Sequence, residues 1–427
     1  MMKRRRRAVF AVVTAVGLLF ASVGIALADD RFGDGFYLPP DPLTVSQPGD
    51  VMRTEPSRIP YAADFPAALP AKTTRVMYRS TGARGNPIAV TGTLLEPKGD
   101  WPGPGPRPLV AFAVGTHGQG DQCAPSRLLN YYLYWKRVLD VFLEYELLFV
   151  QRMIKRGWAV MVTDYEGFGT PAVHTYLNRL SSGQTLLDGA RAALKLPATS
   201  LEPNGPVALW GYSQGGLAAG SAAELAAAYA PELNVVGTYS GAPRADLPTL
   251  TPYLDGGMIV GVMGYMLNAV MAAYPEYSDA VHQLLTPDGE DLVAKTQNQC
   301  LAETMANFGF RHLHRYFNVD LQTLAMTDPL KSYFAQQRLG SQRPDAPVLI
   351  IINRFDPLVP SVGANQLGRE WCAQGADVEF FYNEQPPVFN KLIVNHAMPM
   401  VVDGPRALDW VADRFAGHAS MPNCGRF

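Results

Sequence analysis

Ser213 is the residue of this sequence whose surroundings are most typical of a nucleophile. It lies in the pentapeptide GYSQG at residues 211–215, between an apolar run at 207–210 and a run of small residues at 217–229. A strand, a G-x-S-x-G turn and a helix in this order form the sharp bend that exposes a catalytic serine. Glycine is needed beside the serine because a side chain there would collide with the neighbouring strand or helix. The alternative interpretation is an ordinary strand-to-helix turn.

A serine hydroxyl becomes a good nucleophile when a base takes its proton and a carboxylate orients that base. In enzymes that carry the serine on such a strand-turn-helix bend, the acid follows the serine in the chain and the histidine comes last. The acid is therefore expected just after the buried strand predicted at 348–352, and Asp356 lies there in the turn NRFDPLVP. Asp377 and Glu379, at the start of the next predicted strand, are interpreted as surface or sheet-end charges.

Two of the seven histidines follow this acid in the chain. His396 lies beyond the last predicted strand, on an expected loop from which a base could reach the serine. His418 lies in a glycine-containing tail and is expected to face solvent. His312 and His314 alternate in RHLHR without a suitably spaced carboxylate or cysteine, so we predict a polar surface there rather than a metal site. We expect neither a metal nor another cofactor.

Two backbone N–H groups are needed to stabilise the oxyanion of an acyl-transfer intermediate. The N–H of Gln214, directly after the nucleophile, is one candidate. The second should come from the glycine-rich loop GTHGQG at 115–120, where Gly118 and Gln119 are candidates and His117 is expected to orient the loop. The sequence does not choose between Gly118 and Gln119.

Alternating strands and helices indicate an α/β fold with a mainly parallel sheet and crossover connections. Helices are predicted at 128–156, 185–196 and 405–416, and an antiparallel hairpin at 73–79 and 88–95. The strands predicted for the sheet lie at 109–114, 159–163, 207–210, 235–239, 348–352 and 378–382.

Far more chain separates the strands at 235–239 and 348–352 than a crossover needs. Residues 247–330 are mostly helical by pattern and are predicted to form a cap or lid beside the nucleophile. Four methionines in this stretch would suit an adaptable acyl-binding face, although ordinary core packing explains them equally well. We therefore divide the mature chain into core residues 29–246, cap residues 247–330 and core residues 331–427.

Residues 1–28 are predicted to be a removable export signal. A positively charged start at 3–7 precedes an apolar run at 8–25 and the tripeptide ALA at 26–28. The apolar run approaches the length of a membrane span, so an uncleaved anchor is the alternative. We expect a secreted, extracellular protein, with the cell envelope as a second location.

Composition and cysteine content agree with an exported globular enzyme. Hydrophobic residues make up 48% of the chain against 17% charged residues, which is enough for a large core. A net charge of −2 gives no reason to expect nucleic acid as a partner. Disulfides persist after export, and four cysteines allow three pairings between which the residues alone do not choose. They are Cys123, Cys300, Cys372 and Cys424.

Taken together, these segments resemble the secretory lipase family of the α/β-hydrolase superfamily, the group that includes Candida antarctica lipase A. The signal sequence and composition resemble those of a bacterial member. The matching segments, over roughly residues 50–427, are GYSQG, TDYEGFG at 163–169, CAPS at 123–126, DPLVP at 356–360 and CAQGA at 372–376. The loop GTHGQG departs from the yeast enzyme, which has an acidic residue in this loop, so the oxyanion geometry of that enzyme is not carried over. The resemblance implies a helical cap between the sixth and seventh strands and a triad of Ser213, Asp356 and His396. It also implies the disulfides Cys123–Cys300 and Cys372–Cys424.

The expected function is a serine carboxylic ester hydrolase, a lipase or esterase, that works through an acyl-enzyme. Its expected partner is an ester or lipid substrate, with at most a transient contact between the cap and a lipid interface and no evident protein partner. A cell-envelope acyltransferase would use the same acyl-enzyme. A serine peptidase would use the same triad, but no acidic cluster for a peptide N-terminus is apparent. A binding protein with a vestigial triad would have no use for the intact residues.

Overall fold

A computed structural model describes residues 34–60, 69–130, 133–135, 141–320, 323, 326–389 and 391–427. The export signal predicted at 1–28 lies outside the described residues. Among the helices that are described, none combines the length and the apolar character needed to cross a bilayer.

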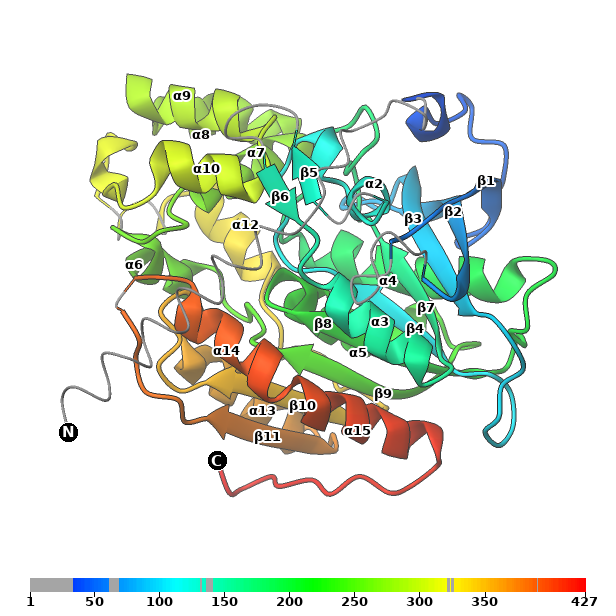
Figure 1. Ribbon diagram of the computed structural model, residues 1–427. Helices are drawn as coiled ribbons and strands as arrows, with labels where there is room; N and C mark the ends of the chain where they lie inside the picture. The colour runs from blue at the N-terminus through cyan, green and yellow to red at the C-terminus, as the bar shows by residue number, and fades with distance from the viewer. Residues whose placement is uncertain are drawn as a thin grey trace, which may run out of the picture.

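Nine strands form a single twisted sheet in the order β1-β2-β3-β7-β4-β8-β9-β10-β11 (Figure 1). The first four pair antiparallel, and every pair from β7 to β11 is parallel. The predicted α/β class with a mainly parallel sheet is therefore confirmed. The strands are β1 Val51–Pro56, β2 Ala71–Thr81, β3 Pro87–Pro97, β7 Ala159–Thr163, β4 Leu109–Ala113, β8 Pro206–Tyr212, β9 Asn234–Gly241, β10 Val348–Asn353 and β11 Val378–Asn383.

Helices cover both faces of this sheet, which explains why its central strands are apolar throughout. Helices α3 (Leu147–Lys155) and α15 (Gly404–Phe415) lie on the face toward the viewer in Figure 1. Helices α4 (Arg179–Lys195) and α5 (Gln214–Tyr229) pack against each other and against the sheet. A Cβ atom on Gly183 of α4 would meet Ser221 of α5, so small residues let these helices approach closely.

The helix predicted at 128–156 is confirmed over 147–155 and is wrong at the described residues between 129 and 146. Its described residues form a two-stranded antiparallel ribbon, β5 (Leu133–Trp135) and β6 (Val141–Leu143), followed by α3. A short helix, α2 (Pro125–Leu128), precedes the ribbon. The sequences LYW and VFL are aromatic and aliphatic residues that favour strands, and this local preference prevails over the apolar helical pattern.

A helical insertion connects β9 to β10 and lies beyond one end of the sheet (Figure 1). Of the methionines considered above, Met263 and Met266 are buried in α7, whereas Met258 and Met271 are partly exposed. Core packing therefore accounts for two of the four. The helices are α6 Thr251–Leu254, α7 Val262–Ala273, α8 Ser278–Gln283, α9 Pro287–Thr296, α10 Leu301–Phe308 and α12 Leu330–Gln336.

The C-terminal arm runs along β11, the last strand of the sheet. Asn423 donates its N–H to the carbonyl of Val378 at 3.0 Å. Its side-chain amide also pairs with both backbone groups of Phe380, at 2.9 Å each. The disulfide between Cys372 of α13 (Ser361–Ala373) and Cys424 fixes the arm in this place.

Candidate active site

Ser213 occupies a strained turn between β8 and α5. Its φ of 60° and ψ of −114° are adopted rarely by residues other than glycine. A Cβ atom on Gly211 would run into the backbone of Gly215, and one on Gly215 would run into the carbonyl of Ala113 on β4. The two glycines of the motif are therefore required by close backbone approach, as expected for a nucleophile elbow.

The structure brings Ser213, His396 and Asp356 together in an unbroken chain of hydrogen bonds. His396 Nε2 lies 2.9 Å from Ser213 Oγ, and His396 Nδ1 lies 2.7 Å from Asp356 Oδ2. The second carboxylate oxygen of Asp356 accepts N–H groups from Leu358 and Val359, each at 2.9 Å. The side chains of Ser213, His396 and Asp356 are all buried. In this arrangement Nδ1–H donates to the carboxylate and Nε2 is left to accept the serine proton.

His396 lies in the first turn of a helix rather than on the expected loop. The helix is α14 (Val394–Val402), and it continues through Pro399. Proline is disfavoured inside a helix because it lacks an N–H and its ring clashes with a preceding carbonyl, so this short helix is not apparent from local preference. The hydroxyl of Tyr212, the residue before the nucleophile, donates to the carbonyl of His396 at 2.6 Å and so ties this helix to the elbow.

The oxyanion loop is bound to the helical insertion. Gln119 donates its N–H to the carbonyl of Gln299 at 3.0 Å, and Leu301 donates to the carbonyl of His117 at 2.8 Å. The N–H of Gln119 therefore already has an acceptor. Gly118 lies between these two bonds with a φ of +141°, and its N–H donates to no backbone carbonyl of the described residues.

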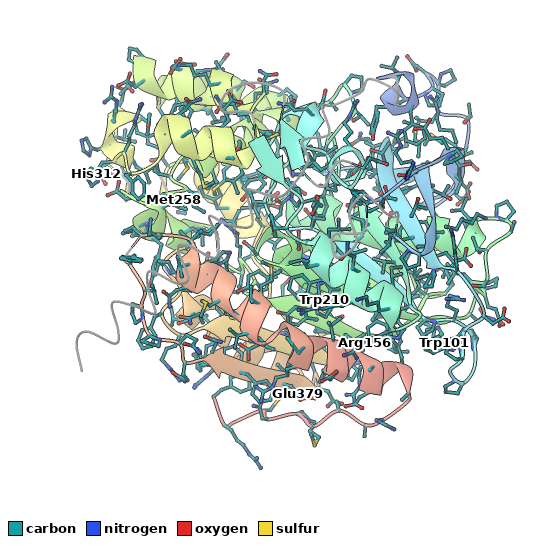
Figure 2. The ribbon with its side chains drawn as sticks, viewed as in Figure 1. Trp101, Arg156, Trp210, Met258, His312 and Glu379 are labelled. Atoms are coloured by element: carbon teal, nitrogen blue, oxygen red, sulfur yellow. A yellow bond between two sulfur atoms is a disulfide. The ribbon has the colours of Figure 1, made fainter. Side chains whose placement is uncertain are left out.

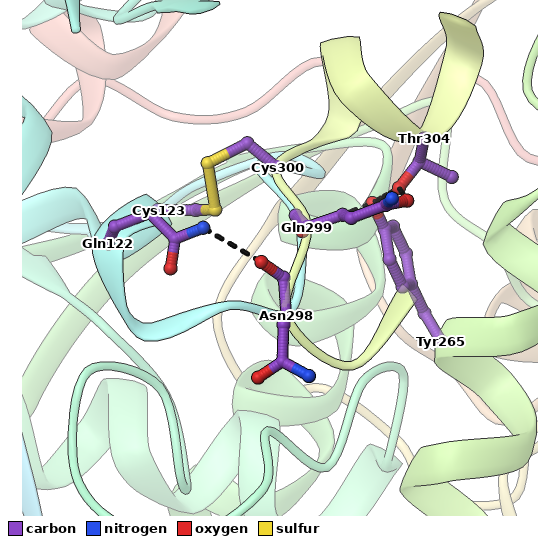
Figure 3. Close-up of a disulfide and its surroundings, with 7 residues drawn as sticks. All are labelled: Gln122, Cys123, Tyr265, Asn298, Gln299, Cys300 and Thr304. Atoms are coloured by element: carbon purple, nitrogen blue, oxygen red, sulfur yellow. Dashed lines mark hydrogen bonds between the residues drawn. A yellow bond between two sulfur atoms is a disulfide. The ribbon is translucent and has the colours of Figure 1, made fainter. Parts of the chain in front are cut away.

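A disulfide reinforces the same junction (Figure 3). Cys123 and Cys300 join the segment after the oxyanion loop to the start of α10. Beside the disulfide, the Gln122 side chain donates to the carbonyl of Asn298 at 2.8 Å. Both disulfides that the family resemblance implied are present, and the described residues contain no free cysteine.

Three buried ionisable side chains lie beneath the oxyanion loop. His117 Nε2 is 2.9 Å from Glu144 Oε2, and Gly115 donates its N–H to Glu146 at 2.7 Å. Burial alone would lower the pKa of His117, but the charge and hydrogen bond of Glu144 outweigh burial and raise this pKa to about 9. Burial raises the pKa of Glu146 to about 8, against the lowering effect of His117. His117 is thus expected to be an imidazolium at neutral pH, paired with Glu144.

These three residues are also the group within the described chain whose ligand atoms lie close enough for a metal ion, within 4.8 Å of one another. The hydrogen bonds argue for a different role. His117 Nδ1 donates to the carbonyl of Gly115 at 2.9 Å while Nε2 donates to Glu144. While both ring nitrogens carry protons, His117 offers a metal no lone pair, and the structure shows the three residues as a hydrogen-bonded group.

His174 holds the side chain of Gln214, the residue directly after the nucleophile. Burial lowers the pKa of His174 to about 4, so the ring is neutral. Its Nδ1–H donates to the carbonyl of Glu166 at 3.0 Å, which leaves Nε2 to accept from Gln214 Nε2 at 3.0 Å. This contact keeps the first residue of α5 in place beside Ser213.

The other histidines and acids considered from the sequence lie away from Ser213. His418 is exposed beside Asp413, and His312 lies at the outer end of the insertion, far from Trp210 on β8 (Figure 2). His314 is exposed as well. Glu379 is not a surface charge: it is buried at the sheet end and accepts the indole N–H of Trp410 at 2.7 Å.

Sequence reasoning missed four polar residues around the site: Glu144, Glu146, His174 and Arg244. The glutamates were hidden inside the stretch predicted to be a helix, and His174 lies in a loop without a motif. Arg244 had a usable signal, because it is a charged residue just beyond the carboxyl end of a buried strand, where ligands bind to parallel sheets.

Comparison with known proteins identifies the family of this chain. The sequence profile described as secretory lipase matches residues 136–423. The chain belongs to the secretory lipase family. Membership of this family and its lipase relatives show that the chain is a carboxylic ester hydrolase. A secreted triacylglycerol lipase of Malassezia furfur is 31% identical to it over 72% of this chain and 79% of that protein. A probable inactive lipase of Mycobacterium tuberculosis is 29% identical over 90% of this chain and 82% of that protein.

Solved structures confirm the α/β-hydrolase fold of this secretory lipase. Candida antarctica lipase A in its closed state has a TM-score of 0.77 and 22% identity, over 94% of this chain and 90% of that chain. The rice cell wall degrading esterase LipA from Xanthomonas oryzae has a TM-score of 0.70 and 20% identity, over 86% of this chain and all of that chain (100%). The resemblance predicted from the sequence is thereby confirmed.

Proposed function

We propose that this chain is a secreted serine ester hydrolase that uses Ser213, His396 and Asp356 as nucleophile, base and orienting acid. The observation that carries the proposal is the continuous hydrogen-bonded chain from Asp356 through His396 to Ser213. Membership of a secretory lipase family and two disulfides support export. Ester and lipid substrates follow from the same membership.

The first half of the reaction acylates Ser213. Its Oγ attacks the ester carbonyl as His396 Nε2 takes the hydroxyl proton, and Asp356 stabilises the imidazolium that forms. The tetrahedral intermediate collapses when the C–O bond to the alcohol breaks and His396 returns the proton to the leaving oxygen. In the second half, water attacks the acyl-enzyme with His396 again as base, which releases the acid and restores Ser213.

Two N–H groups are proposed to bind the oxyanion: that of Gln214, at the start of α5, and that of Gly118. The start of a helix favours negative charge, which adds to the effect of the Gln214 amide. Gly118 is preferred over Gln119 because the Gln119 N–H is already bonded to Gln299. Residues 247–330 are proposed as the cap that covers this site, between core residues 29–246 and 331–427.

One relative is described as a probable inactive lipase, and its inactivity does not carry over to this chain. Here the nucleophile, base and acid are all present, and His396 lies within hydrogen-bonding distance of both Ser213 and Asp356. A vestigial site would be free to lose these contacts. The proposal is therefore an active enzyme.

The test is hydrolysis of p-nitrophenyl esters from acetate to palmitate by the mature chain. Ser213→Ala and His396→Ala are each expected to lower kcat/KM by roughly 10⁴-fold or more. His418→Ala, at an exposed histidine that also contacts an aspartate, is the matched control and should retain wild-type activity. The chain-length optimum separates esterase from lipase. A folded wild type that turns over none of these esters would reject the proposal, and the same preparation would then be assayed with alcohol acceptors for acyl transfer.

A further inference from the structure

Arg244 places a cation beside the nucleophile. It follows the end of β9, and its Nε lies 3.4 Å from Ser213 Oγ. The residue is 1% exposed, so its guanidinium is out of bulk water. Ser213 donates its N–H to the carbonyl of Gly241, the last residue of β9, and this bond fixes the Arg244 segment against the elbow.

No counter-charge accompanies this guanidinium within the part of the chain that the structure describes. Two other buried arginines are ion-paired: Arg75 contacts Glu55, and Arg179 lies 3.2 Å from Glu224. Two more, Arg107 and Arg414, donate to backbone carbonyls instead. Arg244 forms no such ion pair with a described carboxylate, and its Nη1 has no hydrogen-bond partner. A buried charge without a partner is strongly unfavourable. Its retention at this place therefore calls for a ligand that supplies the missing charge.

Arg244 does not lie on the oxyanion side of the site. The sheet order places β9 on one side of β8 and β4, which leads into the oxyanion loop, on the other. Arg244 therefore approaches Ser213 from the side opposite to the loop that carries Gly118. Because Ser213 Oγ bonds to the scissile carbonyl carbon, a group that reaches Arg244 must lie within a few bonds of that carbon.

We propose that Arg244 binds an anionic group, a carboxylate or a phosphate, carried by the ester substrate close to its scissile carbonyl. This inference rests on the proposed esterase function and narrows its substrate class from esters in general to anionic esters. The planar guanidinium suits both groups, because it donates hydrogen bonds to two oxygens of either. The carboxylate would come from the acyl part, as in a half-ester of a dicarboxylic acid, and the phosphate from the alcohol part.

Paired substrates that differ in charge test the proposal. Monoethyl succinate is compared with ethyl 4-methylpentanoate, in which an isopropyl group replaces the carboxylate. Butyryl glycerol 3-phosphate is compared with monobutyrin in the same way. The measured quantity is the ratio of kcat/KM for the anionic ester to that for its neutral partner. In at least one pair, we expect this ratio to fall by roughly 10- to 100-fold in Arg244→Met and by less in Arg244→Lys, which keeps the charge.

The control variant is Arg156→Met, at an arginine that pairs with Asp409. Arg156 precedes the start of β7 and Ser213 follows the end of the parallel strand β8, so the two residues lie at opposite ends of the sheet. This variant should leave the ratio unchanged. A role of Arg244 in positioning Ser213 would lower both rates together and leave the ratio constant, which overturns the proposal. Wild-type preference for the neutral ester in both pairs overturns it without any variant. Neutral-ester turnover that requires Ser213 would, in either case, leave the esterase function standing, whereas absence of all turnover would reject both.

Discussion

The two sides of Ser213 are built from interactions of different range. On the β10 side, Asp356 is held by the N–H groups of its own turn, and His396 begins a helix that packs nearby. On the β4 side, the oxyanion loop depends on Glu144, on the backbone of residues 299–301 and on a disulfide that spans 177 residues. The orienting acid is therefore held locally, whereas the oxyanion side requires the helical insertion to be in place.

The largest effect is expected on the side of the orienting acid. Asp356→Asn keeps the shape of the side chain but loses the charge that orients His396, so kcat should fall by roughly 10⁴-fold. Thermal unfolding should change little because the acceptor to Leu358 and Val359 is retained. Steady-state kinetics and circular dichroism measure the two quantities. Asp413→Asn, at the exposed partner of His418, is the control and should retain full activity.

Gly118→Ala perturbs the oxyanion side directly. An added Cβ would crowd Cys300 and the carbonyl of Gln299, and the φ of +141° disfavours any side chain. Displacement of the N–H should lower kcat by roughly 100- to 1,000-fold, as the loss of one oxyanion donor does. Gly425→Ala also has a positive φ, of +79°, but an added Cβ there meets open space. Equal activity loss in both variants would contradict this role of Gly118.

Removal of each disulfide separates the two kinds of organisation. Cys123→Ser with Cys300→Ser should lower kcat by roughly 10- to 100-fold at temperatures where the variant is folded, because the oxyanion loop is misplaced. Cys372→Ser with Cys424→Ser should leave kcat near the wild-type value. Chain entropy predicts similar losses of unfolding free energy for both pairs, roughly 4 to 5 kcal/mol. If both pairs lower kcat equally, the oxyanion side has no special dependence on the insertion.

The smallest effect is a pH dependence of stability from the charges beneath the oxyanion loop. The pKa of His117 is raised to about 9, so its contribution to stability is full below its ordinary value of about 6.5 and is lost as the pH rises through about 9. The pKa of Glu146 is raised to about 8, so this carboxyl also lowers the stability as the pH rises from its ordinary pKa toward 8. The melting temperature should therefore decline over this range. Glu144→Gln should flatten the decline, and an unchanged slope would contradict the assignment.

Prediction from the sequence succeeded for features held within short segments and failed for those that depend on contacts between distant segments. The elbow, the turn of Asp356 and the parallel strands are encoded by short segments, and each was recognised from local pattern. Glu144, Glu146 and His174 act only after distant segments have been brought together, so no spacing in the sequence marks them. The strand-forming segments 133–135 and 141–143 were misassigned to a helix, and that error hid both glutamates.

The C-terminal arm has a consequence that extends beyond the catalytic centre. β11 is the last strand of the sheet, and unpaired backbone groups on such a strand can recruit a strand from another chain. The side chain of Asn423 pairs with the N–H and the carbonyl of Phe380, and its backbone N–H pairs with the carbonyl of Val378. The ring of Phe427 stacks on that of Phe380, with 4.7 Å between the ring centroids. Because Cys372–Cys424 holds the arm in place, we expect the second disulfide to keep this sheet edge from pairing with a strand of another chain.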